Sequence, residues 1–361
     1  MSLADFTRAR DRLLAADAAE CSSNEVCEEI VRSFHDIARF DWCAVMTTDP
    51  STLLPSGGVV EGFAPEACEP FWDNELLDPD FNKFTDLARS VDPVVTLADA
   101  VDGDLLRSPR YARLYGPLGA ADELRIAFMA GPACLAVGVF LRPGDAGAFN
   151  PEEITDARDL VPVATKVLRR ALGRLHAEAT NEPPTVILLD GEGEVTAMSA
   201  GGQKVLDDIR IDIDDDGELP NMLRTAATKA RWSRTTTNLT TRLRSRSGRW
   251  LRLHVAPMDG DAGTVVLTVE AARPDDLALI LLDSYGLTQR ETEIVMRLCQ
   301  GLSTKEIAGE VMISAHTVRD HVKTIFEKTG VNSRAQLVAS LFSNHLLDRF
   351  HQTISHVHSP D

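Results

Sequence analysis

The side chains with the clearest chemical potential lie on one predicted helix near the C-terminus, residues 315–329. Its apolar residues fall at i, i+4, i+7 and i+8 and so form one stripe: Val318, Val322, Ile325 and Phe326. Polar side chains lie off this stripe, in the N-terminal half: His316, Thr317, Arg319, Asp320 and Lys323. Arg319 and Lys323 can donate to guanine O6 and N7, whereas Asp320 can only accept, for example from cytosine N4. The pattern predicts a helix anchored on one face and suited to base edges in a major groove on the other.

Capping residues predict three more helices around this one, at about 289–300, 304–311 and 334–342. Capping boxes are expected at three places, with Ser314 as a further N-cap: Thr288-x-x-Glu291, Ser303-x-x-Glu306 and Ser333-x-x-Gln336. Gly301 and Gly330 stand where the first and third helices must end in a left-handed residue. Residues 312–314 alone join the second and third helices, and this spacing is typical of a helix-turn-helix.

Residues 287–342 resemble the LuxR-type helix-turn-helix, which also occurs in NarL-like response regulators. The matching residues are Leu287, Thr288, Arg290, Glu291, Gly301, Ser303, Lys305, Glu306, Ile307, Ala308, Ser314, Thr317, Val318, His321, Val322, Lys328, Gly330, Val331, Ser333 and Arg334. The resemblance implies contacts to base edges from Arg319, Asp320 and Lys323. It implies contacts to the DNA backbone from a second set: Ser303, Lys305, Thr317, His321, Lys328 and Arg334.

Several of these residues have a second interpretation. Asp320 is an acid where basic or apolar residues are often seen, which leaves the target sequence open, and it can instead pair within the helix with Lys323 or Arg319. His321 can make a structural backbone contact. Glu291 is expected to cap its helix and brace the fold rather than touch DNA. The fourth helix either supplies a dimer contact, as the resemblance implies, or packs only within its own unit.

The charge of the whole chain at first argues against a nucleic-acid partner. The sequence holds 37 Lys and Arg against 55 Asp and Glu, a net charge of −18, which repels phosphate. The acidity is uneven, because residues 283–361 hold eight basic and nine acidic side chains and the remainder holds 29 and 46. We therefore expect the acidic part to weaken non-specific DNA binding and to mask the basic face until a signal arrives.

Two boundary stretches divide the chain into segments 1–180, 181–273 and 274–361: Asn181–Pro184 and Arg273–Asp276. The first segment has a predicted strand at 42–46 and a hairpin at 125–141 between helical patterns, and it resembles a GAF domain. The second resembles a PAS domain, chiefly through VILLDGEGEVTAMSAGGQKVL, and predicts a hairpin at 185–196, a helix at 222–231 and strands at 235–241, 250–255 and 263–269. The predicted fold is two α+β sensor domains, GAF-like and PAS-like, followed by an all-α four-helix LuxR-type helix-turn-helix domain with its core at 287–342.

The helix predicted to begin after Asn150 carries apolar residues at alternating steps of three and four: Ile154, Ala157, Val161, Ala164, Leu168, Ala171 and Leu175. This spacing fits a coiled-coil seam between two chains. It also fits an amphipathic helix that covers the segment's own sheet. The sequence leaves both interpretations open.

The sequence predicts a transcription regulator and no enzyme. It contains no GxSxG, HExxH or GxxxxGK[ST] motif, and its six cysteines form no CxxC. We therefore expect no catalytic residue, no metal and no resident cofactor, and the sensor ligand is not specified. With no apolar leader and no uninterrupted apolar run of membrane-spanning length, a cytoplasmic protein without membrane contact is expected.

The resemblances also imply partners. They are double-stranded promoter DNA, RNA polymerase, a small-molecule ligand in the GAF-like or PAS-like domain, and a second copy of the chain in a homodimer. An alternative function is a masked helix-turn-helix that acts mainly as a protein-interaction anti-regulator.

Overall fold

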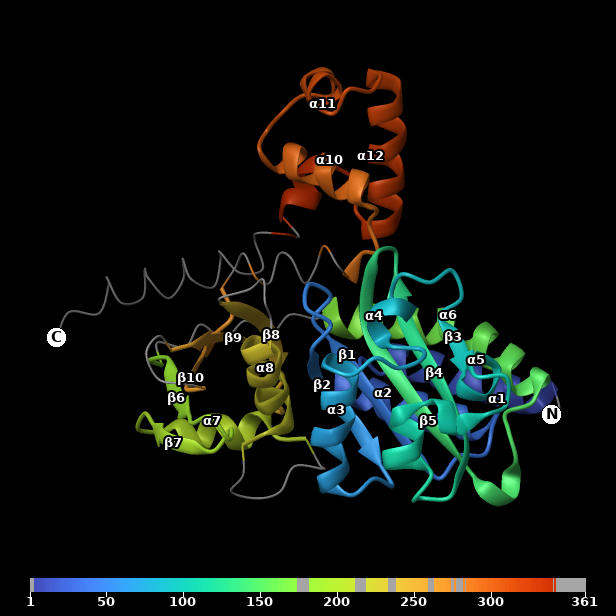
Figure 1. The fold of residues 1–361 in the computed structure, drawn as a ribbon. Helices are drawn as coiled ribbons and strands as arrows, with labels where there is room; N and C mark the ends of the chain where they lie inside the picture. Colours follow the sequence, from blue (N-terminus) through green and yellow to red (C-terminus); the bar gives the residue numbers. More distant parts are fainter. Residues whose placement is uncertain are drawn as a thin grey trace.

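The computed structural model describes residues 3–173, 182–211, 219–232, 238–258, 263–273, 276, 282, 284–339 and 341. Figure 1 shows three units along the chain. We call residues 3–173 the first unit, the described residues of 182–273 the second unit and those of 284–341 the third unit. None of the described helices is long and apolar enough to cross a membrane.

The first unit is built on a five-stranded antiparallel sheet with the strand order β2-β1-β5-β4-β3. Its strands are β1 (Trp42–Thr48), β2 (Pro55–Glu61), β3 (Val94–Thr96), β4 (Ala120–Ala130) and β5 (Ala133–Pro143). Three long helices form a core with one face of the sheet: α1 (Leu3–Ala18), α2 (Ser23–His35) and α6 (Pro151–Gly173). Short helices α3 (Cys68–Leu76), α4 (Phe84–Leu87) and η3 (Tyr111–Tyr115) lie against a second core on the other face. The remaining short elements are η1 (Pro65–Ala67), α5 (Leu97–Ala100), η2 (Leu105–Arg107) and η4 (Gly144–Ala146).

These elements confirm the strand predicted at 42–46 and the hairpin predicted at 125–141. Helix α6 begins as expected, because the Asn150 side chain accepts from the backbone N–H groups of Glu152 and Glu153, each at 3.0 Å. The described residues of the predicted apolar stripe on α6 are all buried in the core of the first unit. The stripe therefore covers its own sheet, and the coiled-coil interpretation of these residues is wrong; Leu175 lies outside the described residues.

The second unit repeats the same strand order in another antiparallel sheet, β7-β6-β10-β9-β8. Its elements are β6 (Thr185–Leu189), β7 (Val195–Met198), α7 (Gly202–Ile209), α8 (Asn221–Trp232), β8 (Leu239–Arg244), β9 (Trp250–Pro257) and β10 (Val265–Ala271). The predicted hairpin at 185–196 pairs as β6 with β7, and the helix expected at 222–231 is α8. Residues 235–237 of the strand predicted at 235–241 lie outside the described residues. Two antiparallel α+β units thus precede the third unit.

The third unit is helical. It consists of α10 (Gln289–Cys299), α11 (Thr304–Glu310) and α12 (Ala315–Thr329), and a fourth helix begins at residue 334. These bounds confirm the predicted helices to within a residue or two where they are described. One apolar cluster joins all four helices and includes Ile294, Ile307, Val318, Ile325 and Leu337.

A loop of the first unit is inserted into the second unit. Leu54, between β1 and β2, is 1% exposed and lies in the apolar core of the second unit. In the same loop, the buried Asp49 accepts from Arg242 on β8: Nη2–Oδ1 is 2.7 Å, Nε–Oδ2 is 3.0 Å and the backbone N–Oδ2 is 2.8 Å. Burial raises the pKa of Asp49, but the hydrogen bonds and charge of Arg242 outweigh it, so the pKa lies below its ordinary value. The two α+β units are therefore joined by a buried ion pair.

Replacing Arg242 with Met should destabilise the chain by about 3–5 kcal/mol, because the Asp49 carboxylate then stays buried without its cation. The midpoint of thermal unfolding, followed by circular dichroism, measures this loss. Arg273→Met is the matched control, since the Arg273 side chain is 57% exposed and pairs with Glu270 at 3.2 Å; its loss should cost at most about 1 kcal/mol. Equal effects of the two substitutions would contradict the role of the buried pair.

Candidate nucleic-acid interface

Local hydrogen bonds fix the ends of the helices in the third unit. The Thr288–Glu291 and Ser303–Glu306 capping boxes are both formed, and Ser314 Oγ accepts from the backbone N–H of Thr317 at 3.0 Å. Gly301 and Gly330 have φ values of 95° and 72°, as predicted for left-handed helix ends.

The predicted capping box of the fourth helix differs in one bond. Ser333 Oγ accepts from the backbone N–H of Gln336 at 3.1 Å, as expected. The Gln336 side chain, however, accepts from the backbone N–H of Asn332 at 2.9 Å instead of that of Ser333. The Gln336 side chain thus closes the turn one residue earlier than a standard capping box does.

The turn between α11 and α12 depends on a residue that the sequence did not single out. Met312 has φ = 52°, in the left-handed region, and its side chain is 90% exposed. Glycine usually marks such a backbone position, so a methionine gives no sequence signal for it. The Ile313 N–H donates to the carbonyl of Ala308 at 3.1 Å and closes the turn onto α11.

Helix α12 has one anchored face and one exposed face. Val318 and Ile325 are 0% exposed, and Val322 and Phe326 pack against the same apolar cluster. The three residues predicted to contact bases, Arg319, Asp320 and Lys323, are all exposed and lie close together on the helix surface. The structure therefore brings this predicted set onto one open surface, which we call the reading face.

Asp320 makes an intrahelical pair, but with a different partner from the two considered. His316 Nδ1 lies 2.9 Å from Asp320 Oδ2, one turn earlier on the helix. Lys323 Nζ is instead 4.0 Å from Glu327 Oε1. Both pairs are exposed, and such pairs contribute at most about 1 kcal/mol. Asp320 and Lys323 can therefore exchange these partners for others at little cost.

The residues predicted to contact the DNA backbone divide into two groups. Ser303, Lys305 and Thr317 are exposed, and His321 is half-buried. Lys328 and Arg334 are half-buried and hold the fold together. Lys328 Nζ donates to Glu291 Oε2 at 2.6 Å and to the carbonyl of Gly286 at 3.3 Å. Arg334 donates to the carbonyls of Leu298 at 2.6 Å and Leu302 at 2.8 Å.

The capping box with Thr288 confirms that Glu291 caps α10, and the ion pair with Lys328 shows that Glu291 also braces the unit. Burial raises the pKa of Glu291, but the hydrogen bond from Lys328 and those from Thr288 outweigh it, so the pKa lies below its ordinary value. Through this pair the C-terminal end of α12 is fixed to the start of α10, and the reading face takes a defined orientation.

The third unit rests on the β4–β5 turn of the first unit. A Cβ atom on Gly131 in that turn would lie 2.9 Å from the carbonyl oxygen of Gly286, so the two backbones are in contact. Figure 1 shows α12 running from the outer end of the third unit toward the sheets. The reading face is exposed in this arrangement, which does not favour the masked, anti-regulator alternative.

Comparison with known proteins identifies the third unit. Residues 285–341 match the family described as "Bacterial regulatory proteins, luxR family". Over 55 residues the chain is 47% identical to the spore germination protein GerE of Bacillus subtilis (strain 168), a match that covers 15% of this chain and 74% of GerE. The chain belongs to the luxR family of bacterial regulatory proteins. It is a LuxR-type DNA-binding transcription regulator.

The chain is also similar to other bacterial regulators. The chain is 40% identical over 62 residues to the probable transcriptional regulatory protein NarL of Mycobacterium tuberculosis (strain ATCC 25618 / H37Rv), covering 17% of this chain and 29% of NarL. A solved structure, SdiA in complex with octanoyl-rac-glycerol, aligns over 94% of this chain and 96% of its own at 13% identity with a TM-score of 0.34. The luxR identity rests on the third unit.

Replacing Lys328 with Met should destabilise the LuxR-type unit by about 1–3 kcal/mol, because it leaves the largely buried Glu291 carboxylate without its ammonium partner. The depressed pKa of Glu291 gives the wild type stability that is present above the ordinary carboxylate range and is lost as the pH falls through the folded-state pKa. Without Lys328 this acid-dependent loss should be smaller. Denaturant unfolding from pH 7 to pH 3 measures both effects.

The control for this experiment is Lys323→Met on the same helix. The Lys323 side chain is 81% exposed, so its loss should leave stability and its pH dependence nearly unchanged. The structural role assigned to Lys328 would be wrong if the two variants unfolded alike.

Proposed function

We propose that this LuxR-family chain regulates transcription by reading a specific DNA sequence with α12, under the control of a signal received by its first and second units. The observation that supports this most strongly is the reading face of α12, which is exposed while the opposite face is fixed in the core of the third unit. A helix held in this way fits the major groove and presents side chains to base edges.

In the proposed complex, Arg319 and Lys323 donate to guanine, and Asp320 accepts from a base amino group once its pairing with His316 opens. Ser303, Lys305, Thr317 and His321 contact the DNA backbone. Lys328 and Arg334 are proposed to reach phosphates as well, and each would then share its donors between phosphate oxygens and the internal acceptors it already has.

The signal-receiving role is assigned to the first and second units. We propose a GAF-like domain in residues 1–180 and a PAS-like domain in residues 181–273, and the order of the five strands, identical in the two sheets, supports a related role for both. We also propose that the regulator works as a homodimer, in which two copies of α12 meet half-sites about one helical turn apart. Promoter DNA, RNA polymerase and a small-molecule signal are the proposed partners, and the proposed location is the cytoplasm.

Arg319→Ala should weaken binding to the preferred site by about 1–3 kcal/mol, roughly 5- to 150-fold, and should relax base preference at one position. The site is first selected from a random duplex library with the wild-type chain, and affinities are then measured by fluorescence anisotropy at several salt concentrations. Lys305→Ala should instead weaken all duplexes about equally and reduce the salt slope by about one.

Arg273→Ala, in the second unit, is the control and should leave DNA affinity unchanged. A combined Arg319→Ala/Lys323→Ala variant that bound the selected site as tightly as the wild type would refute the proposed reading face.

A further inference from the structure

An apolar cavity of about 110 Å³ lies where the first and second units meet. On the first unit it is lined by Met46 and Val139 from the sheet, Trp72 from α3 and Tyr115 from η3. On the second unit it is lined by Ile211 and by Met222, at the start of α8. The cavity is therefore complete only when the two units are together.

Buried charged groups fix α3 and η3, which line one side of the cavity, to strand β4. Glu75 on α3 accepts from Arg125 at 2.8 Å. Glu123 accepts from Arg110 at 2.7 Å and from the hydroxyl of Tyr115 at 3.0 Å. The side chains of Arg110, Glu123 and Arg125 are all 0% exposed. Because breaking buried ion pairs is costly, α3 and η3 cannot move inward to fill the space, and the cavity is preformed.

The lining determines the class of molecule that fits. The surrounding side chains are mostly aliphatic and aromatic, and the Tyr115 hydroxyl is already used by Glu123. A charged group placed among them would lose its hydration without gaining an oppositely charged partner, since no charged side chain among the described residues lines the cavity. The volume is on the same scale as an engineered cavity of about 150 Å³ that holds benzene. A small neutral molecule with a largely hydrocarbon surface meets both conditions.

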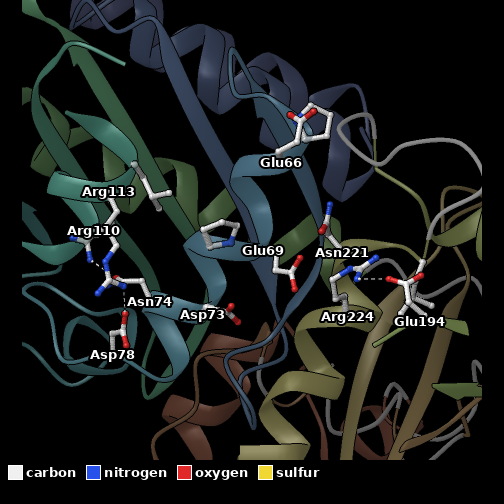
Figure 2. A pocket seen from close by; sticks show the side chains of 14 residues that line it. Glu66, Glu69, Asp73, Asn74, Asp78, Arg110, Arg113, Glu194, Asn221 and Arg224 are labelled. Carbon is white, nitrogen blue, oxygen red and sulfur yellow. Dashed lines mark hydrogen bonds and ion pairs between the residues drawn. The ribbon is translucent and has the colours of Figure 1, made fainter. Parts of the chain in front are cut away.

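A polar cleft of about 610 Å³ adjoins this cavity and shares Leu114 and Asn221 with it. Figure 2 shows the cleft between the first unit, which contributes Glu66, Glu69 and Asp73, and the second unit, which contributes Glu194 and Arg224. In the part of the chain that the structure describes, the cleft lining carries five carboxylates against three guanidinium groups, so a molecule that approaches from this side is disfavoured if it is an anion. A cation is disfavoured at the next step, because the apolar lining of the cavity would remove its hydration.

We propose that the apolar cavity binds a small, uncharged, largely hydrocarbon molecule and holds it between the first and second units. That this molecule is the signal for the regulator rests on the function proposed above, but its binding does not. Helix α8 connects the cavity to the contact between the two units. Met222 on this helix lines the cavity, and Lys229 on the same helix donates to the carbonyl of Thr52 in the inserted loop. A bound molecule thus stabilises the contact that also contains the Asp49–Arg242 pair.

The test uses benzene as the probe and the full chain labelled with 13C on its methionine methyl groups. Benzene should shift the signals of Met46 and Met222, which line the cavity, and should raise the midpoint of thermal unfolding. Met258, Met296 and Met312 are 48%, 49% and 90% exposed and serve as internal references that should not move. Unchanged Met46 and Met222 signals at saturating benzene would overturn the proposal.

Two kinds of control sharpen this test. Benzoate and benzylammonium carry the same ring with a charge, and they should shift neither Met46 nor Met222; binding as strong as that of benzene would overturn the assigned class.

Met222→Trp should fill the cavity and abolish the benzene effect, whereas Met258→Trp should retain it. If Met222→Trp fails to fold, Ile211→Phe fills the cavity from the same unit and should at least halve the benzene-induced shift of Met46. A benzene effect undiminished in a folded filling variant would also overturn the proposal.

The DNA-reading function is tested separately. The Arg319→Ala/Lys323→Ala variant should still bind benzene at the cavity although it no longer reads DNA. If the wild type bound benzene at the cavity but did not bind DNA tightly, only the proposed function would be refuted. If it bound DNA tightly but did not bind benzene at the cavity, only the cavity proposal would be refuted.

Discussion

A helix can read the edge of a base only if its opposite face cannot move. In this chain that constraint is met by the burial of Val318 and Ile325 and by the ion pair between Lys328 and Glu291. The apolar contacts fix the rotation of α12 about its axis. The ion pair fixes the end of α12 to the start of α10. The exposed position of Arg319 and its neighbours follows from these contacts.

The same third unit is placed relative to the rest of the chain by polar and backbone contacts. Arg242, which pairs with Asp49 of the first unit, also lies 3.5 Å from the carbonyl of Asp276, in the segment that leads to the third unit. The close contact between Gly131 and Gly286 adds a second point of support. Arg242 therefore contacts both the inserted loop of the first unit and the chain that precedes the third unit.

The sequence predicted the third unit well because its determinants are local. Helix caps such as Thr288 and Ser303, and the left-handed Gly301, act within a few residues and leave a direct pattern. The pairing of Asp49 with Arg242 spans 193 positions and depends on how two units dock, which no local pattern encodes. The left-handed Met312 was also missed, because the turn onto α11 requires that conformation of a residue type that does not signal it. The internal bonds of Lys328 and Arg334 were missed because they join residues more than 30 positions apart.

In the proposed complex, α12 places hydrogen-bond donors against guanine in the major groove. Dimethyl sulfate probing tests this contact directly, because the reagent methylates guanine N7 in that groove and adenine N3 in the minor groove. With the selected duplex and the wild-type chain, we expect protection at guanine N7 within each half-site, with adenine N3 still reactive. Guanine N7 that reacts equally in free and bound DNA, or protection confined to adenine N3, would contradict it.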